Sequence, residues 1–197
     1  MHSKTMTYLM ENDAGRYQRH DLQRRYVADD FETNLNAATN DHPLDAEWAG
    51  FTDEVMGGRS TAEVYQDNIL GKGCLHVQGD VTCEDGGGFV QVAMHPANDR
   101  QFFDVSDYAG VQILVLGNNQ KYNVHLRTSD CRFHEQSYRK TFFAPARWER
   151  LCFTWSDFTP HGLAVPFNPQ LLQRVGVLGW MRDFHMDLAI GEVAFFA

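Results

Sequence analysis

The sequence lacks both a long apolar run and an excess of basic residues. No stretch approaches the ~20 consecutive apolar residues that a membrane-spanning helix needs. Its 26 acidic side chains outnumber its 17 basic ones, and the net charge at pH 7 is −9. A nucleic-acid-binding surface needs concentrated positive charge. We therefore expect a soluble protein that neither spans a membrane nor binds nucleic acid.

Cysteine is scarce, and its spacing argues against a common kind of metal site. The four cysteines (Cys74, Cys83, Cys131 and Cys152) contain no Cys-x-x-Cys pair, which disfavours a structural zinc site. Cys74 and Cys152 lie among apolar residues and are expected to be buried thiols. No secretory signal is recognised ahead of them, so we expect a reducing, cytoplasmic compartment.

The chain also lacks the usual signatures of nucleophilic and nucleotide chemistry. It has no Gly-x-Ser-x-Gly turn, and Gly86-Gly87-Gly88 is followed by neither Lys-Ser/Thr nor a predicted helix. The nine histidines match no zinc-ligand spacing, although His185 and Asp187 form a His-x-Asp pair. Hydrolase, nucleotide-binding and zinc-dependent functions are therefore disfavoured, and no metal is expected in the site.

Residues 1–28 differ from the rest of the chain in charge and pattern. Their five basic and three acidic side chains give a local charge of +2. Residues 14–26 suit a short polar helix with a thin apolar face. The acidic residues and weak amphipathicity disfavour an organelle transit peptide. We expect residues 1–28 to be a helical or irregular extension and residues 29–197 to form the domain.

From residue 62 onward, short alternating segments between turn residues indicate strands. Leu75 and Val77 alternate with His76 and Gln78, for example. Segment 117–120 (Gly-Asn-Asn-Gln) is interpreted as a hairpin turn. Varied spacing and several doubly apolar segments favour an all-β sandwich of two antiparallel sheets. The expected strands are 73–79, 89–94, 111–116, 122–127, 137–143, 148–155, 174–181 and 186–196, with the first strand entered at 29–32 through Phe31.

A glycine-rich turn follows Trp48 and Phe51, which return the chain to the core. Two adjacent glycines permit backbone angles that a side chain penalises, so this segment can turn sharply or approach another backbone. Its carboxyl, guanidinium and hydroxyl groups suit hydrogen bonds that tie the turn down. The residues assigned to this structural loop are Asp53, Met56, Gly57, Gly58, Arg59 and Ser60.

This turn, which reads Asp-Glu-Val-Met-Gly-Gly-Arg-Ser over residues 53–60, resembles the signature of the complex I intermediate-associated protein 30 (CIA30) family. Thr52 stands where asparagine is usual. The resemblance covers about residues 48–197 and implies a jelly-roll sandwich of the galactose-binding-like kind. Mitochondrial members assist the assembly of respiratory complex I, and relatives of the fold bind carbohydrate. Further matching pieces are 86–89, 104–111, 122–128, 137–138, Trp148, 158–162 and 175–179.

The strongest candidate surface is the predicted strand 122–127. Period two places its apolar residues toward the core and Asn123, His125 and Arg127 in a row on the other face. Such a row suits a carboxylate, a set of sugar hydroxyls or the backbone of a partner, with Arg139 on a neighbouring strand. A structural arginine and an ordinary aromatic core fit the pattern as well. The candidate ligand-binding residues are Asn123, His125, Arg127, Tyr138, Trp155 and Trp180.

We expect no cofactor, and a structural calcium ion is the one alternative. Sandwiches of this general fold often hold calcium near the start of the domain, where Asp29, Asp30 and Glu32 supply oxygen donors. However, the closing strand carries Gly191 and Glu192 where the analogy expects an aspartate ligand. Calcium is therefore the minor alternative.

The candidate surface supports three functional hypotheses. The leading one is a non-enzymatic binding or assembly-factor domain, chaperone-like, that recognises a partner protein or a small ligand. The second is a small-molecule enzyme of the cyclase or lyase type, with His125 or Tyr138 as general acid or base beside Arg127. The third is a carbohydrate-binding module with an aromatic floor. A pocket joining the three residues would favour chemistry or ligand binding, and a flat apolar patch would favour assembly.

Overall fold

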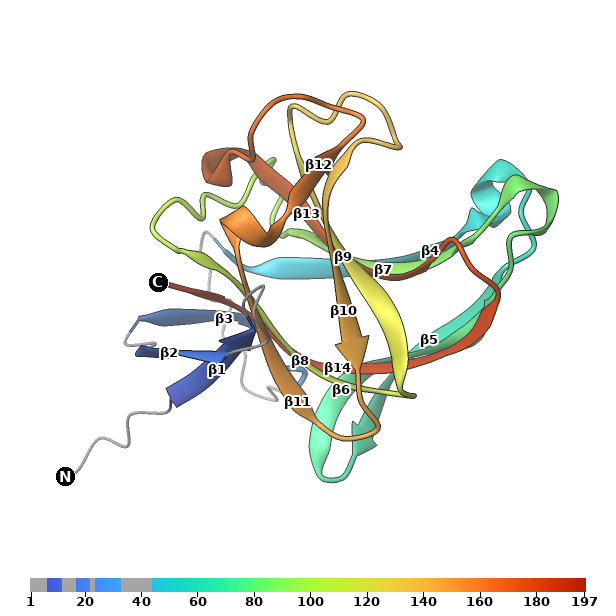
Figure 1. Cartoon of the computed structure of the whole chain (residues 1–197), viewed down its shortest axis with the longest axis horizontal. Coiled ribbons are helices and arrows are strands. Elements are labelled where there is room, and N and C mark those ends of the chain that lie inside the picture. Colours follow the sequence, from blue (N-terminus) through green and yellow to red (C-terminus); the bar gives the residue numbers. More distant parts are fainter. Residues whose placement is uncertain (1–6, 12–16, 22–23, 33–43) are drawn as a thin grey trace.

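The computed structural model describes residues 7–11, 17–21, 24–32 and 44–197, which form two antiparallel sheets (Figure 1). The first sheet contains β4 (Ala46–Thr52), β7 (Phe89–Pro96), β9 (Gln120–Thr128), β10 (Ser137–Ala144), β12 (Thr159–His161) and β13 (Leu172–Trp180). The second contains β3 (Arg25–Asp29), β5 (Thr61–Ile69), β6 (Lys72–Val81), β8 (Gly110–Gly117), β11 (Glu149–Thr154) and β14 (Phe184–Phe196). A separate hairpin pairs β1 (Thr7–Glu11) with β2 (Tyr17–Asp21).

The strand order is β12-β10-β9-β13-β7-β4 in the first sheet and β11-β8-β14-β6-β5 in the second. The expected all-β, two-sheet antiparallel sandwich is confirmed. Short 3₁₀ helices join some strands: η1 (Asp53–Met56), η2 (Glu84–Gly86), η3 (Trp155–Asp157) and η4 (Pro169–Leu171). In none of the described segments is there a helix with the length and apolarity that crossing a bilayer requires.

The core lies between the two sheets, where alternate residues of each strand point inward. In β9, Tyr122, Val124 and Leu126 are fully buried in this core, which confirms the expected alternation of that strand. β14 runs through the middle of the second sheet and pairs with β8 from Leu188 to Phe196. Its other edge pairs with β6 as far as Ile190 and with β3 from Val193 onward, so one long strand links both parts of that sheet.

Segment 117–120 is not a hairpin turn, so that prediction is wrong. β8 pairs with β11 and β14 in the second sheet, whereas β9 pairs with β10 and β13 in the first. The segment therefore carries the chain from one sheet to the other. Its backbone groups bond to a neighbouring crossover: Gly117 N donates to Pro145 O at 2.8 Å, and Asn119 N donates to Ala144 O at 3.0 Å.

The helix expected over residues 14–26 is also wrong where the structure describes the chain. Residues 17–21 and 25–26 lie in strands β2 and β3, and the other residues of that range, apart from Arg24, fall outside the described residues. A short helix with a thin apolar face gains little stability by itself. Instead, the backbone groups of residues 25–29 are paired with the end of β14.

The strand expected to begin at residues 29–32 is misplaced. β3 ends at Asp29, so Phe31 lies after the strand and not in it. Phe31 adopts a left-handed backbone with φ of 53°, and its ring centroid lies 5.4 Å from that of Trp48. The Asp29 carboxylate accepts hydrogen bonds from Phe31 N and from Trp48 Nε1, each at 2.9 Å. This carboxylate thus ties the segment after β3 to β4.

Candidate functional site

The Asp53 carboxylate lies at the centre of the glycine-rich turn. It is fully buried and accepts hydrogen bonds from Ser60 N at 2.9 Å and Ser60 Oγ at 2.5 Å. It also accepts from Gly88 N at 2.5 Å and Phe89 N at 3.1 Å. Burial raises the pKa of Asp53, but these hydrogen bonds from Ser60, Gly88 and Phe89 outweigh burial and hold the pKa below its usual value.

The glycines of the turn make room for that carboxylate. A Cβ at Gly58 or at Gly87 would overlap the Asp53 carboxyl group, and Gly57 ends η1 with a left-handed φ of 88°. Arg59 Nε donates to the Asp85 carboxylate at 2.5 Å, while Met56 is exposed. The side chains of Asp53, Arg59 and Ser60 are thus engaged within the turn or with residues 84–89.

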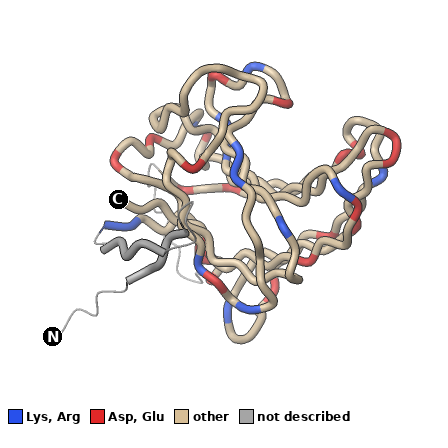
Figure 2. Tube along the Cα trace, viewed as in Figure 1, with Lys and Arg blue, Asp and Glu red and all other residues tan. Residues whose placement is uncertain are grey.

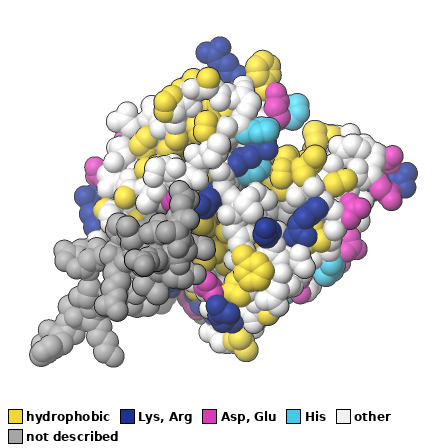
Figure 3. Space-filling view, in the orientation of Figure 1, with side chains coloured by type: hydrophobic (Ala, Val, Ile, Leu, Met, Phe, Trp, Pro, Cys, Tyr) yellow, Lys and Arg dark blue, Asp and Glu magenta, His cyan; other side chains and the backbone are white. Residues whose placement is uncertain are grey.

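The best candidate for a binding surface is the outer face of the first sheet, which we define by Asn123, His125, Arg139, Arg174 and Trp180. These residues point away from the core, and strand register places Arg139 beside His125, and His125 beside Gly176 of β13. Among the described residues, no further sheet covers this face. Figure 3 shows Lys, Arg and His side chains gathered at a hollow between the upper loops and the lobe on the right.

His125 and Trp180 form the centre of the outer face together with Arg139. The imidazole and indole centroids are 5.2 Å apart in an edge-to-face arrangement. The Arg139 guanidinium lies 4.8 Å from the indole centroid, within cation–π range. Arg139 is held there by hydrogen bonds to Ser137 Oγ and Glu135 O, each at 2.8 Å. An aromatic ring and a fixed cation are therefore presented side by side.

His125 is only 7% exposed, and its Nε2 has no hydrogen-bond partner among the described residues. Burial, followed by the positive charges of Arg139 and Arg174, lowers the pKa of His125 to about 3. The imidazole is consequently neutral at physiological pH. A general acid or base works best with a pKa near the operating pH, and His125 is poorly matched to that task.

Arg127 and Asn123 flank His125 on β9. The Arg127 guanidinium donates to four backbone carbonyls, those of Cys131 (3.0 Å), Phe133 (3.0 Å), His134 (2.8 Å) and Gln136 (2.6 Å). It thereby organises the loop between β9 and β10, which matches the structural alternative left open above. Asn123 Oδ1 accepts a hydrogen bond from Thr141 Oγ1 at 2.8 Å.

Tyr138 and Trp155 are not brought together with His125. Tyr138 is fully buried on the core side of β10, and its hydroxyl donates to Val165 O at 3.0 Å and Pro166 O at 3.2 Å. Trp155 packs in η3 and donates Nε1–H to Tyr108 O at 2.7 Å. The grouping of His125, Arg127 and Tyr138 around one substrate atom is therefore absent from this arrangement.

Three residues on this side of the first sheet escaped the sequence interpretation: Arg174 of the outer face, and Gln91 and His95, which alternate with the core residues of β7. The alternation of β7 and β13 was readable, but only the strand order reveals that β13 lies beside β9 and that β7 follows β13. Arg174 stands next to Arg127, and a Cβ at Gly176 would overlap the Gln91 amide. The glycine thus makes room for Gln91 on this face.

The residues considered for calcium are engaged in other contacts. Glu32 Oε1 lies 2.5 Å from Lys72 Nζ, Glu192 pairs with Arg25, and Asp29 is bonded as described above. Within the described segments, no group of three or more His, Cys, Asp or Glu side chains converges to hold a metal ion. Calcium remains a prediction that these contacts do not support.

Comparison with known families identifies the chain. Residues 36–182 match the sequence profile described as complex I intermediate-associated protein 30 (CIA30). The chain belongs to this family. The resemblance drawn from the glycine-rich turn is thereby confirmed, and the CIA30 profile spans both the turn and the outer face. A comparison with curated protein sequences finds no match.

Several solved structures similar to this CIA30 chain are carbohydrate-binding modules. The family 11 module from Clostridium thermocellum, in complex with a β-1,3-1,4-mixed-linked tetrasaccharide, has a TM-score of 0.65 and 9% identity, covering 87% of this chain and 94% of that one. A family 30 module has a TM-score of 0.52 and 11% identity, covering 70% and 81%. These likenesses confirm the jelly-roll, galactose-binding-like fold.

Proposed function

We propose that this CIA30 protein is a non-catalytic binding domain that acts as an assembly factor and holds a partner segment on its outer face. The observation that carries the proposal is the arrangement of Trp180, His125 and Arg139 on a sheet face that no other described strand covers. An indole beside a fixed guanidinium offers apolar contact and directional hydrogen bonding together, a combination common at centres of protein recognition.

The same geometry supports binding over catalysis. The proposed acid–base residues face opposite sides of the sheet, and His125 stays neutral over the physiological range. The Arg127 guanidinium is occupied by backbone carbonyls. Binding on this face needs no proton transfer, so these features are no obstacle to it.

A capture experiment from the native host tests the assembly role. Tagged wild-type protein should retain subunits or assembly factors of a respiratory complex, and Trp180→Ala with Arg139→Ala should lose them. Tyr65→Ala is the matched aromatic control, because Tyr65 is exposed on β5 in the second sheet. If wild-type protein captures no respiratory component, or the double variant captures as much, the proposal is wrong.

Carbohydrate binding on the same face is the second candidate function. It is favoured by the half-buried indole of Trp180 next to polar side chains, a pairing that suits a sugar ring. The mixed-linked tetrasaccharide bound by the family 11 module is a suitable first probe. We expect quenching of tryptophan fluorescence that Trp180→Ala abolishes. Absence of saturable binding across a panel of soluble glycans would reject this candidate.

A further inference from the structure

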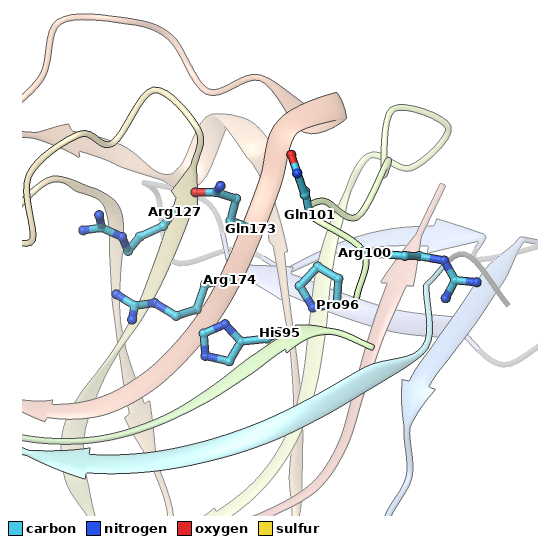
Figure 4. Close-up of a pocket in the computed structure, with 7 residues that line it drawn as sticks. All are labelled: His95, Pro96, Arg100, Gln101, Arg127, Gln173 and Arg174. Atoms are coloured by element: carbon cyan, nitrogen blue, oxygen red, sulfur yellow. The ribbon is translucent and has the colours of Figure 1, made fainter. Parts of the chain in front are cut away.

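A pocket opens where β7, β9 and β13 run side by side at the end of the outer face (Figure 4). Its volume is about 300 Å³. In Figure 4 the side chains of Arg127, Arg174 and His95 extend in the same direction, with the Gln173 amide near Arg127. The lining residues are His95, Pro96, Arg100, Gln101, Arg127, Gln173 and Arg174.

The lining is rich in donors and contains no carboxylate. Glu47, opposite His95 on β4, is the acidic group that acts on His95, but it is not part of the lining. Positive charge is thus concentrated in one pocket of a protein whose net charge is −9. An electropositive concavity on an acidic protein attracts anions, because low-dielectric walls focus its field.

Arg174 is the least compensated cation of the pocket. Its buried Nε has no hydrogen-bond partner, and no described acceptor bonds to its other nitrogens. Its guanidinium lies 5.5 Å from the centroid of the Phe51 ring. Burial and then the charge of Arg127 lower the pKa of Arg174 to about 10. Arg174 is half-buried, so water reaches its charge only in part, and a bound anion would supply the missing partner.

The other donors suit the same ligand. The pKa of His95 is lowered by burial and then by Arg174, so at neutral pH its imidazole presents one N–H and one acceptor nitrogen. Gln173 adds an amide N–H from the strand that carries Arg174. A guanidinium fork with neighbouring N–H donors matches the oxygens of carboxylates and phosphates.

We propose that this pocket binds the oxyanion group of a small ligand, a carboxylate or a phosphate, with Arg174 as the principal contact and His95 and Gln173 as further donors. Arg174 belongs to the outer face, but none of Trp180, His125 and Arg139, which carry the proposed function, lines this pocket, and Arg174 lies six residues from Trp180 along β13. Anion binding in this pocket therefore does not depend on the proposed function, and either proposal can be wrong without the other.

Titrations at constant ionic strength test this site. Inorganic phosphate, citrate and acetate are added to the full chain, with sodium chloride as the reference, and binding is followed by calorimetry and thermal melting. Either phosphate or the carboxylates should bind saturably and raise the melting temperature. The anion that binds more tightly identifies whether the pocket prefers a phosphate or a carboxylate. If none binds more tightly than chloride, the proposal is overturned.

Two substitutions of Arg174 separate ligand binding from structure. Arg174→Met keeps the aliphatic stem and should weaken anion binding at least tenfold, without lowering the melting temperature in anion-free buffer. Arg174→Lys keeps the charge but loses the fork, and should weaken binding at least threefold. Arg139→Met is the matched control on the same face and should bind the anion within twofold of wild type. Equal binding by Arg174→Met, or a lower melting temperature without anion, would contradict the proposal.

Discussion

The Asp53 carboxylate connects two loops that are distant in sequence. Its four hydrogen bonds come from Ser60 on one side and from Gly88 and Phe89 on the other. Since buried donors that lose their acceptor keep the full desolvation cost, this one side chain controls the geometry of both loops. The aspartate of the family signature thus has a structural role, because it holds the two loops together.

Replacement of Asp53 should destabilise the domain strongly. Asp53→Ala leaves three backbone N–H groups, those of Ser60, Gly88 and Phe89, and the Ser60 hydroxyl without this acceptor, and we expect the free energy of unfolding to fall by about 3 kcal/mol. Urea denaturation measures it. Arg59→Ala in the same turn removes only the exposed ion pairs with Glu84 and Asp85 and should cost under about 1 kcal/mol. Similar losses for both variants would contradict this account.

His125 should make stability depend on pH in a defined window. Its folded pKa of about 3 lies below the ordinary value of 6.5, so below pH 6.5 the unfolded chain binds a proton that the folded chain does not. The free energy of unfolding should therefore fall as the pH drops from 6.5 toward 3, by at most about 1.4 kcal/mol per pH unit.

His125→Phe keeps a ring against Trp180 and should remove this component, because the unpartnered Nε2 goes with it. Chemical denaturation between pH 4 and pH 7 gives the slope for each variant. His185→Phe is the control, since His185 is exposed and pairs with Asp80 at 2.9 Å. An unchanged slope in His125→Phe would show that another group is responsible.

The crossover between β8 and β9 shows how two connections stabilise each other. The segment after Gly117 and the β10–β11 connection run alongside, joined by hydrogen bonds to Ala144 O and Pro145 O. Asn119 Oδ1 also accepts from Ala146 N at 3.1 Å. These bonds satisfy the backbone N–H groups of Gly117, Asn119 and Ala146 where the chain passes between the sheets.

Close packing at Gly117 should make this crossover sensitive to added volume. A Cβ at Gly117 would lie 2.5 Å from Ala144 Cβ and 3.0 Å from Ala144 O. Gly117→Ala should therefore cost about 1–3 kcal/mol, measured by urea denaturation. The double variant Gly117→Ala with Ala144→Gly removes the closer contact and should recover part of that loss. A neutral single variant would mean that the two connections are free to separate.

Across the whole molecule, charge is distributed unevenly. Figure 2 shows Lys and Arg positions on strands of the first sheet, whereas many Asp and Glu positions lie on loops and on the lobe that carries η1 and η2. The outer face is therefore positive on a protein of net charge −9. Salt should weaken the binding of an acidic ligand to this face, because exposed charges are screened over about 10 Å at an ionic strength of 0.1 M.

The thiols report on the integrity of the whole domain. Cys83 is exposed, whereas Cys74, Cys131 and Cys152 are buried, and all four are free. A chromogenic disulfide reagent should label one thiol per native chain, slowly because burial and then Asp183 raise the pKa of Cys83. The other three should react only after unfolding. Cys83→Ser should abolish native labelling, and fast labelling of several thiols would indicate a looser fold.

Much of the architecture was predictable because strand alternation is a local property. β9 and β13 follow from period two in the sequence, and the glycine-rich turn identifies the family without reference to strand order. The outer-face positions of Asn123, His125 and Arg127 followed from the same alternation. By contrast, the first strand was misplaced because pairing of β3 with β14 joins opposite ends of the chain.

The sequence by itself determined eight of the strands (β6 to β11, β13 and β14), the alternation of their side chains between two faces, and the family to which the chain belongs. Only the tertiary structure decided that segment 117–120 changes sheets, that Tyr138 faces the core, and that Arg174 lies beside Arg127. The physical reason is that strand partners are chosen by burial and hydrogen bonding between distant segments. A binding face assembled from several strands therefore becomes visible only when their order is known.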